Sequence, residues 1–256
     1  MEMNSSQKGS YFYYRVWDRS LRVFHWVNFI CVSVLMGVGL IILFNKSLGI
    51  SSDGKILLKT IHAYVGYVFV LNLLWRFIWG FVGNRYSRWK GILPFGEEYR
   101  KSLILYLKDF KDSKRPVYAG HNPLARLMVS FLFVLLSLQA ATGLTLAGTD
   151  LYLPPFGHEM AEWVTGSGED HSKLKNLQPG SKEAVDPEAY RQMREFRKPF
   201  ITIHVYGFYV LFVAIIIHIM GVVITERVEK SGLISAMFTG NKVFTKKPVD
   251  ADDDRL

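Results

Sequence analysis

Four long apolar stretches separate the polar parts of this chain. They cover about residues 23–44, 60–82, 124–148 and 200–224. Each is close to the roughly 20 residues that a helix needs to cross a bilayer. Buried core helices of a water-soluble protein are the alternative, but four such long stretches rarely occur in one soluble domain. The pattern therefore predicts an all-α membrane protein, a bundle of four transmembrane helices.

The basic residues give this bundle an orientation. Lysine and arginine are frequent before the first stretch, between the second and third, and after the fourth, whereas residues 149–199 mix basic and acidic side chains. Cytoplasmic loops carry the excess of Lys and Arg, so we expect both termini inside and 149–199 as a periplasmic loop of a bacterial inner-membrane protein. The net charge of +9 then lies beside anionic membrane lipid, and no separate basic domain indicates nucleic-acid binding.

Composition also suggests how the chain is divided. We expect one membrane domain over residues 1–248, with disordered residues before about Tyr11 and a disordered tail over 249–256. A loop as long as 149–199 usually has a function or is disordered. We expect a folded cap followed by a mobile charged part.

Local signals mark several helix ends. Asn122 and Pro123 have the residue types of an N-cap and a first helical position, so they predict the start of the third helix. Pro199 is expected to begin the fourth helix in the same way. Between the second and third stretches, Glu97 to Phe110 has apolar residues on one side and lysines on the other, which predicts an interfacial or surface amphipathic helix.

Four histidines lie near these spans. His204 and His218 are 14 residues apart in IHVYGFYVLFVAIIIHIM, so both leave the same face of one helix, roughly 21 Å apart along its axis. His25 and His62 lie at the starts of two other spans that run in opposite directions. Depth then pairs His25 with His218 near the cytoplasmic face and His62 with His204 near the periplasmic face.

Such pairs are typical of two stacked bis-histidine haems, because imidazole is a common axial ligand of haem iron. A planar macrocycle also needs room beside its ligands. Three of the histidines have a glycine one turn further along their helix, namely Gly66, Gly207 and Gly221. His25 has no glycine at this place. Small residues also help membrane helices to pack, which is the alternative interpretation of the three glycines.

Arg76 lies inside the second span, in LLWRFIW. A charged residue there is unfavourable unless it is paired. It follows His62 by 14 residues, on the same face, so our hypothesis is that it pairs with a propionate of the cytoplasmic haem or with a quinone oxygen. The alternative is snorkelling to the headgroups. His121 and Asn122 are two further residues that we assign to the quinone end.

At these residues the chain resembles the b-type cytochrome subunit of membrane-bound Ni,Fe-hydrogenases, within the bacterial dihaem cytochrome b superfamily. The resemblance covers most of residues 15–245. The stretches that carry it are VWDRSLRVFHW, IHAYVGY, WGFVGNRYSRW, GHNPLARLM, the last two histidines and LISAMFTGNKV. The resemblance implies two b haems ligated by His25, His62, His204 and His218. It also implies electron transfer between a periplasmic hydrogenase small subunit and membrane quinone.

The loop 149–199 departs from this family, since it is longer and more charged than in typical members. A periplasmic cytochrome c or another periplasmic oxidoreductase therefore stays open as the partner. Two other classes also stay open: a transporter that uses the histidines as a proton relay, and a structural anchor for a peripheral enzyme. In the favoured interpretation the chain is an electron-transfer subunit, with catalysis restricted to a quinone site.

Overall fold

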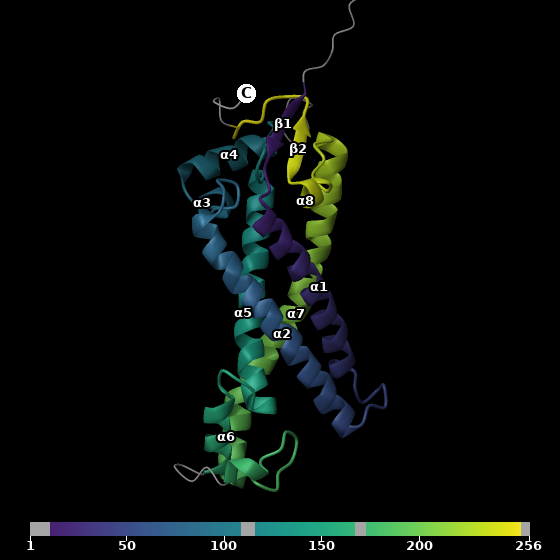
Figure 1. Ribbon diagram of the computed structural model, residues 1–256, viewed down its shortest axis with the longest axis vertical. Helices are drawn as coiled ribbons and strands as arrows, with labels where there is room; N and C mark the ends of the chain where they lie inside the picture. Colours follow the sequence, from purple (N-terminus) through teal and green to yellow (C-terminus); the bar gives the residue numbers. More distant parts are fainter. Residues whose placement is uncertain (1–10, 109–115, 167–172, 252–256) are drawn as a thin grey trace, which may run out of the picture. The chain divides into compact units, whose positions relative to one another are not determined.

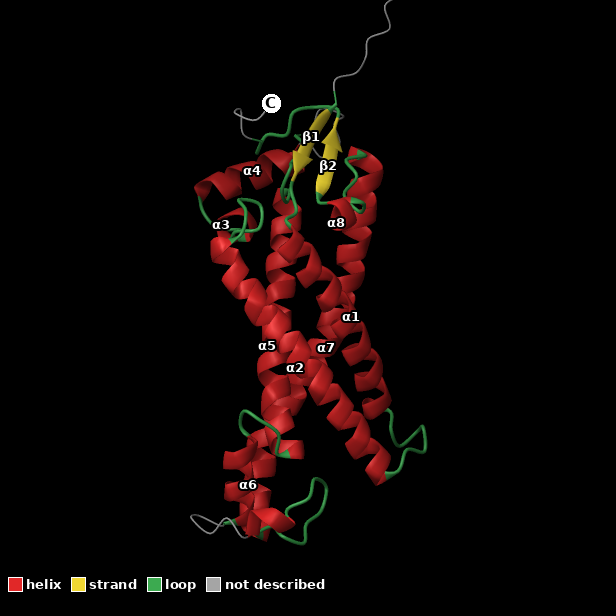
Figure 2. Cartoon of the chain, in the orientation of Figure 1, coloured by secondary structure: helices red, strands yellow, loops and turns green. Residues whose placement is uncertain are grey.

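The structure is a computed structural model that describes residues 11–108, 116–166 and 173–251. These residues are mostly helical, with one small antiparallel strand pair (Figures 1 and 2). In chain order the elements are β1 (Phe12–Arg15), α1 (Arg19–Leu43), α2 (Ser52–Val82), α3 (Trp89–Ile92), α4 (Glu97–Lys108), α5 (Pro123–Leu151), α6 (Gly157–Thr165), a 3-10 helix (Lys173–Asn176), α7 (Pro187–Glu229), α8 (Ala236–Thr239) and β2 (Asn241–Phe244).

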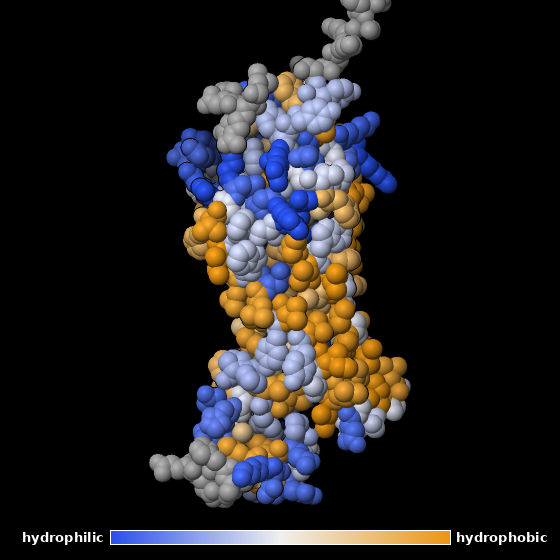
Figure 3. Space-filling model, viewed as in Figure 1, coloured by the Kyte–Doolittle hydropathy of each residue, from blue (hydrophilic) through white to orange (hydrophobic). Residues whose placement is uncertain are grey.

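Helices α1, α2, α5 and α7 are long and apolar enough to cross a membrane. In each helix, no more than 22 % of the most apolar 18-residue segment is buried. Large apolar side chains such as Leu71, Val134 and Val213 are exposed, and Figure 3 shows apolar residues over the middle parts of these helices. Water cannot solvate so much apolar surface on four helices, whereas lipid can. The soluble alternative is therefore wrong, and the chain is a multi-pass membrane protein.

The chain forms two compact units. Unit 1 contains the described residues of three stretches: those before His25, Arg76–Phe133, and those from Ala214 onward. Its strands β1 and β2 pair antiparallel, with Phe12 opposite Phe244. Apolar side chains from distant parts of the sequence pack beside this pair and form its core: Val16, Trp17, Ala119, Ala236 and Phe244.

Unit 2 contains His25–Trp75 and Val134–Val213. It includes most of α1 and α2, the second half of α5, and the first part of α7. The segment between α5 and α7 is partly folded. Helix α6 ends at Thr165, and its C-cap Gly166 adopts a left-handed conformation. The Asp186 N–H donates to the carbonyl of Val164 at 2.8 Å. The predicted folded cap is therefore present, while residues 167–172 of the predicted mobile part lie outside the described residues.

The prediction that Pro199 begins the fourth helix is wrong. Helix α7 starts at Pro187 and contains Pro199 in its interior. The Asp186 side chain accepts a hydrogen bond from the Ala189 N–H at 2.8 Å, so Asp186 and Pro187 provide the N-cap and first helical position. Hydropathy marks only the apolar part of this helix, because its first turns are polar and lie before the span.

The start of α5 is confirmed, since Asn122 Oδ1 accepts a hydrogen bond from the Ala125 N–H at 2.8 Å. The amphipathic helix expected from Glu97 is confirmed as α4, with the last expected residues outside the described part.

The predicted tail boundary at residue 249 is too early. The Val249 N–H donates to Val117 at 3.0 Å, and Asp250 accepts from the backbone N–H groups of Ala119 and Gly120. Residues 1–10 and 252–256 lie outside the described residues.

Candidate functional site

Two of the predicted ligands meet in unit 2. The rings of His62, on α2, and His204, on α7, have centroids 6.2 Å apart and planes inclined at 72°. Two imidazoles bonded to one metal atom at about 2 Å per bond would have centroids about 6 Å apart. The Nδ1 atom of His62 is buried and has no hydrogen-bond partner among the described residues. The spacing and chemistry of this pair therefore fit a shared haem iron.

Thr142, on α5, contacts the ring of His204 and favours one of its tautomers. Its hydroxyl donates to the carbonyl of Leu138 at 2.7 Å, and its oxygen lies 2.9 Å from Nδ1 of His204. A hydroxyl has a single proton, so when it donates to Leu138 it acts as an acceptor toward His204, an arrangement that favours the hydrogen on Nδ1. Nε2 is then left with a free lone pair, the form that binds a metal.

Glycines on two other helices lie against these rings. A Cβ atom built on Gly39, of α1, would be 3.4 Å from Cε1 of His62, and one on Gly143, of α5, would be 3.4 Å from Cε1 of His204. A Cβ at this distance is in ordinary van der Waals contact with the ring, so the backbone of a neighbouring helix packs closely against each histidine.

The three glycines predicted from sequence have different surroundings. A Cβ on Gly66 or Gly221 would meet no described atom within 4 Å, whereas one on Gly207 would clash with Nε2 of Gln139 at 2.5 Å. Gln139 uses this atom to donate to the carbonyl of His204 at 3.0 Å. Gly207 therefore allows a close contact between α5 and α7, and the role of Gly66 and Gly221 beside a haem stays a prediction.

His25 and His218 fall in different units. His25, on α1 in unit 2, packs edge-on against Trp26 with ring centroids 5.7 Å apart. His218, on α7 in unit 1, is half-buried. Their pairing stays a prediction.

Arg76 is enclosed in unit 1 and does not snorkel. It is 1 % exposed, and its Nη2 donates to the carbonyl of Ser87 at 2.9 Å. Its guanidinium carbon lies 5.0 Å from the ring centroid of Trp89 and 5.5 Å from that of Phe133. Its Nη1 is buried without a hydrogen-bond partner among the described residues. A buried donor without a partner is unfavourable, so this atom fits an acceptor supplied by a bound group.

The stretches VWDRS and GNRYSR meet beside Arg76. Asp18 accepts hydrogen bonds from the Trp79 indole at 3.0 Å and from the Ser87 hydroxyl at 2.7 Å. Burial by itself would raise the pKa of Asp18, but hydrogen bonds, first from the Leu21 N–H and then from Trp79 and Ser87, hold it below its ordinary value. Asp18 therefore stays ionised and holds the loop that supplies the Ser87 carbonyl to Arg76.

The stretch GHNP forms a second polar cluster in unit 1. Lys242, 2 % exposed, donates to the carbonyls of Ala119 and Gly120 at 2.8 and 3.2 Å. The His121 ring centroid lies 4.9 Å from that of Trp17. Burial, and then the charge of Lys242, lower the pKa of His121 to about 3, so it is neutral at physiological pH. Asn122 caps α5, and the assignment of His121 and Asn122 to a quinone site stays a prediction.

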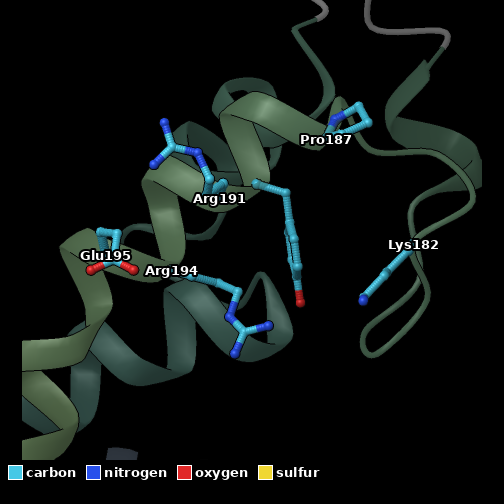
Figure 4. Close-up of a pocket in the computed structure, with 6 residues that line it drawn as sticks. Lys182, Pro187, Arg191, Arg194 and Glu195 are labelled. Atoms are coloured by element: carbon cyan, nitrogen blue, oxygen red, sulfur yellow. The ribbon is translucent and has the colours of Figure 1, made fainter.

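No group of three or more His, Cys, Asp or Glu side chains within residues 11–108, 116–166 and 173–251 is arranged to hold a bare metal ion. Unit 2 has an open pocket at the start of α7, lined by Lys182, Pro187, Tyr190, Arg191, Arg194 and Glu195. Figure 4 shows its charged side chains spread around an open surface, and Arg191 is paired with Glu188. The histidine pair is therefore the better cofactor site.

The contact from Thr142 gives a first testable expectation. Thr142→Val removes the acceptor for the His204 Nδ1–H, so the imidazole becomes a weaker electron donor. We expect the midpoint potential of a haem ligated by His62 and His204 to rise and its retention to fall by roughly 10-fold or more. Redox titration of the purified protein measures the first effect. Thr142→Ser keeps the hydroxyl and should behave as wild type, and equal potentials in all three proteins would contradict the assigned tautomer.

Four membrane-crossing helices and two histidines that face one another are typical of one class, helical membrane proteins that ligate a metal between spans. The chain belongs to the prokaryotic cytochrome b561 family, whose sequence pattern it matches over residues 16–240. The resemblance found from the quoted stretches is thereby confirmed. The chain is a b-type cytochrome of the membrane, and its cofactor is haem b.

Individual relatives agree with this assignment. The chain is 25 % identical over 242 residues to a protein of Rhodobacter capsulatus named "Probable Ni/Fe-hydrogenase B-type cytochrome subunit", covering 90 % of this chain and 81 % of the relative. It is 34 % identical over 145 residues to "Probable Ni/Fe-hydrogenase 1 B-type cytochrome subunit" of Escherichia coli K12, covering 51 % of this chain and 59 % of that protein. No solved structure matches the chain significantly.

Proposed function

We propose that the chain is the dihaem cytochrome b subunit that passes electrons between a periplasmic Ni,Fe-hydrogenase and membrane quinone. The observation that carries the proposal is the separation of 6.2 Å between the rings of His62 and His204. The hydrogenase is proposed as partner because the similar proteins of Rhodobacter capsulatus and Escherichia coli bear that name.

The residues of the chain have three tasks in this function. Haem iron, when bound, supplies reversible one-electron transfer. His62 and His204 ligate the periplasmic haem, and Thr142 holds His204 in the metal-binding tautomer. The surrounding apolar helices exclude water and thereby influence the potential.

His25 and His218 are proposed to ligate the second haem. His25 lies six residues after the start of α1, and His218 lies eleven residues before the end of α7. With both termini in the cytoplasm, each of these positions falls in the cytoplasmic half of its own helix. Together the four histidines would form a two-step route across the membrane.

The quinone end is proposed near Arg76, at the cytoplasmic side. Its buried Nη1 has no partner among the described residues, which supports contact with a haem propionate or a quinone oxygen. The aromatic rings of Trp89 and Phe133 hold the guanidinium in place. Arg76 would therefore act by charge and hydrogen bonding rather than by proton exchange.

The alternatives differ in partner and in class. The segment that contains α6 and the polar start of α7 is proposed to face the partner. Another periplasmic oxidoreductase or a cytochrome c therefore stays open as the partner. A histidine proton-relay transporter is disfavoured, because membership of a b-type cytochrome family supports haem as the ligand of these side chains.

A dithionite-reduced minus oxidised spectrum of the purified protein, with pyridine haemochrome quantification, tests the proposal. We expect two b haems per chain and reoxidation of the reduced protein by a quinone analogue. No haem under adequate haem supply would reject the cytochrome function. Haem that is not reoxidised by quinone would reject the quinone-linked role alone.

A further inference from the structure

A charged cluster lies near the His62–His204 pair in unit 2. The carboxylate of Asp150, on α5, binds Nζ of Lys59, on α2, through Oδ2 and Nη1 of Arg197, on α7, through Oδ1. The three side chains are largely buried, at 29 %, 13 % and 20 % exposure for Lys59, Asp150 and Arg197. Three separate helices thus bring two cations and one anion together in a place of low solvent access.

The cluster is aligned with the two ligands. Lys59 precedes His62 by three residues and Arg197 precedes His204 by seven, spacings that return to nearly the same helix face. Asp150 follows Gly143, which lies against His204, by seven residues. At about 1.5 Å per residue, these groups lie about 4 to 11 Å beyond the ligands along their own helices, toward the same end of unit 2.

The charges of the cluster do not balance. Among the ion pairs of the described residues, two cations share one carboxylate, so one positive charge is left over there, and Lys55, one turn before Lys59, adds to it. Buried charges need partners, and an incompletely compensated cation is unfavourable. The Nε atom of Arg197 is also buried without a hydrogen-bond partner among the described residues. Charge and donors together fit one further anion, of carboxylate type.

Haem b carries carboxylates on one edge of its ring, as propionates. We propose that Lys59 and Arg197 bind a propionate of the haem held by His62 and His204, while Asp150 fixes the two cations in position. This proposal rests on the proposed haem function of the two histidines. The two cations are positioning residues that also raise the potential of this haem, because positive charge stabilises the reduced iron. A tie between three helices, without contact to the haem, is the competing explanation.

Redox titration of the purified dihaem protein tests the proposal. Arg197→Gln and Lys59→Gln should each lower the midpoint potential of the periplasmic haem, by about a tenfold change in the ferric/ferrous equilibrium, which is 59 mV for one electron. Asp150→Asn should raise it, and Arg197→Lys should restore most of the wild-type value. Arg194→Gln removes an equal charge one turn further out, at an exposed position, and should leave the potential unchanged.

A second measurement separates contact from distant charge. The Arg197→Gln shift should largely disappear when the protein is reconstituted with haem dimethyl ester, whose propionates are neutral. An Arg197→Gln shift that is equally large with haem b and with haem dimethyl ester would overturn the propionate contact. Unchanged potentials in Arg197→Gln and Lys59→Gln, with two haems still bound per chain, would overturn it as well. Both outcomes would leave the proposed haem function in place. Wild-type protein without haem would instead reject the proposed function. If Arg197→Gln fails to fold, Lys59→Gln and Asp150→Asn provide the same test.

Discussion

Replacement of His204 by alanine should reduce the bound haem from two to one per chain. His204 and His62 face one another across 6.2 Å, and a haem iron that keeps only one of two imidazoles in an apolar site is held far more weakly. Replacement of His218 should also remove one haem, in this case the cytoplasmic haem proposed for His25 and His218. Pyridine haemochrome quantification gives the number, and the surviving midpoint potential shows which haem remains.

The two variants are informative as a pair. His204→Ala and His62→Ala should both retain the same haem and therefore show the same midpoint potential. His218→Ala and His25→Ala should both retain the other haem, with the other midpoint potential. His158→Ala is a suitable control, because this side chain is exposed on the folded loop, where it pairs with Glu162, and its loss should not alter the haem content. If His62→Ala and His204→Ala keep different haems, the pairing by depth is wrong even though haem is bound.

The part of the fold that depends on hydropathy could be predicted from the sequence. The four spans and the N-cap of α5 follow from local patterns. The choice of four histidines among seven as ligands stays a prediction. The start of α7 was misplaced because its polar turns have no hydropathy signal, although Asp186-Pro187 is a recognisable helix start. The N-cap signal of Asp186 followed by Pro187 predicts the start of α7 when it is given more weight than hydropathy.

The contacts of His62 and His204 with other helices could not be predicted in the same way. Gly39 and Gly143 contact His62 and His204 from other helices, and Thr142 contacts His204 from α5. Such contacts depend on which helices are neighbours and on their rotation, and neither follows from spacing within one helix. The sequence instead suggested glycines on the ligand helices themselves, where Gly207 serves contact between α5 and α7.

For Arg76, the sequence predicted the need for a partner but not which residues surround the side chain. Its position in a span indicated that it must be paired, but its partners Ser87 and Trp89 come from the polar segment after α2. The enclosure required Asp18 as well, which binds Ser87 and Trp79. Conformation of a connecting segment is set by such long-range contacts, so it has no simple periodic signal.

Arg76→Leu should lower the midpoint potential of the cytoplasmic haem while leaving the periplasmic haem unchanged. A buried positive charge about 10 Å from an iron is worth about 1 to 2 kcal/mol at an effective dielectric constant of 20, equivalent to about 60 mV. Arg76→Lys retains the charge and should keep most of the potential. Redox titration of the dihaem protein, with the two potentials assigned through the histidine variants, measures the effect.

A matched arginine separates this charge effect from a general loss of packing. Arg126 also lies over an aromatic ring, with its guanidinium carbon 5.0 Å from the centroid of Tyr99, and donates to the carbonyl of Lys90 at 3.1 Å. Arg126→Leu should destabilise the protein without a comparable shift in potential. Arg76→Leu also removes the donor to Ser87, at about 1 to 3 kcal/mol of stability, so thermal unfolding is expected to change in both variants. If the midpoint potentials of both haems are unchanged in Arg76→Leu, the contact between Arg76 and a haem propionate is rejected. If the same variant also reduces quinone normally, Arg76 has no role at the quinone site.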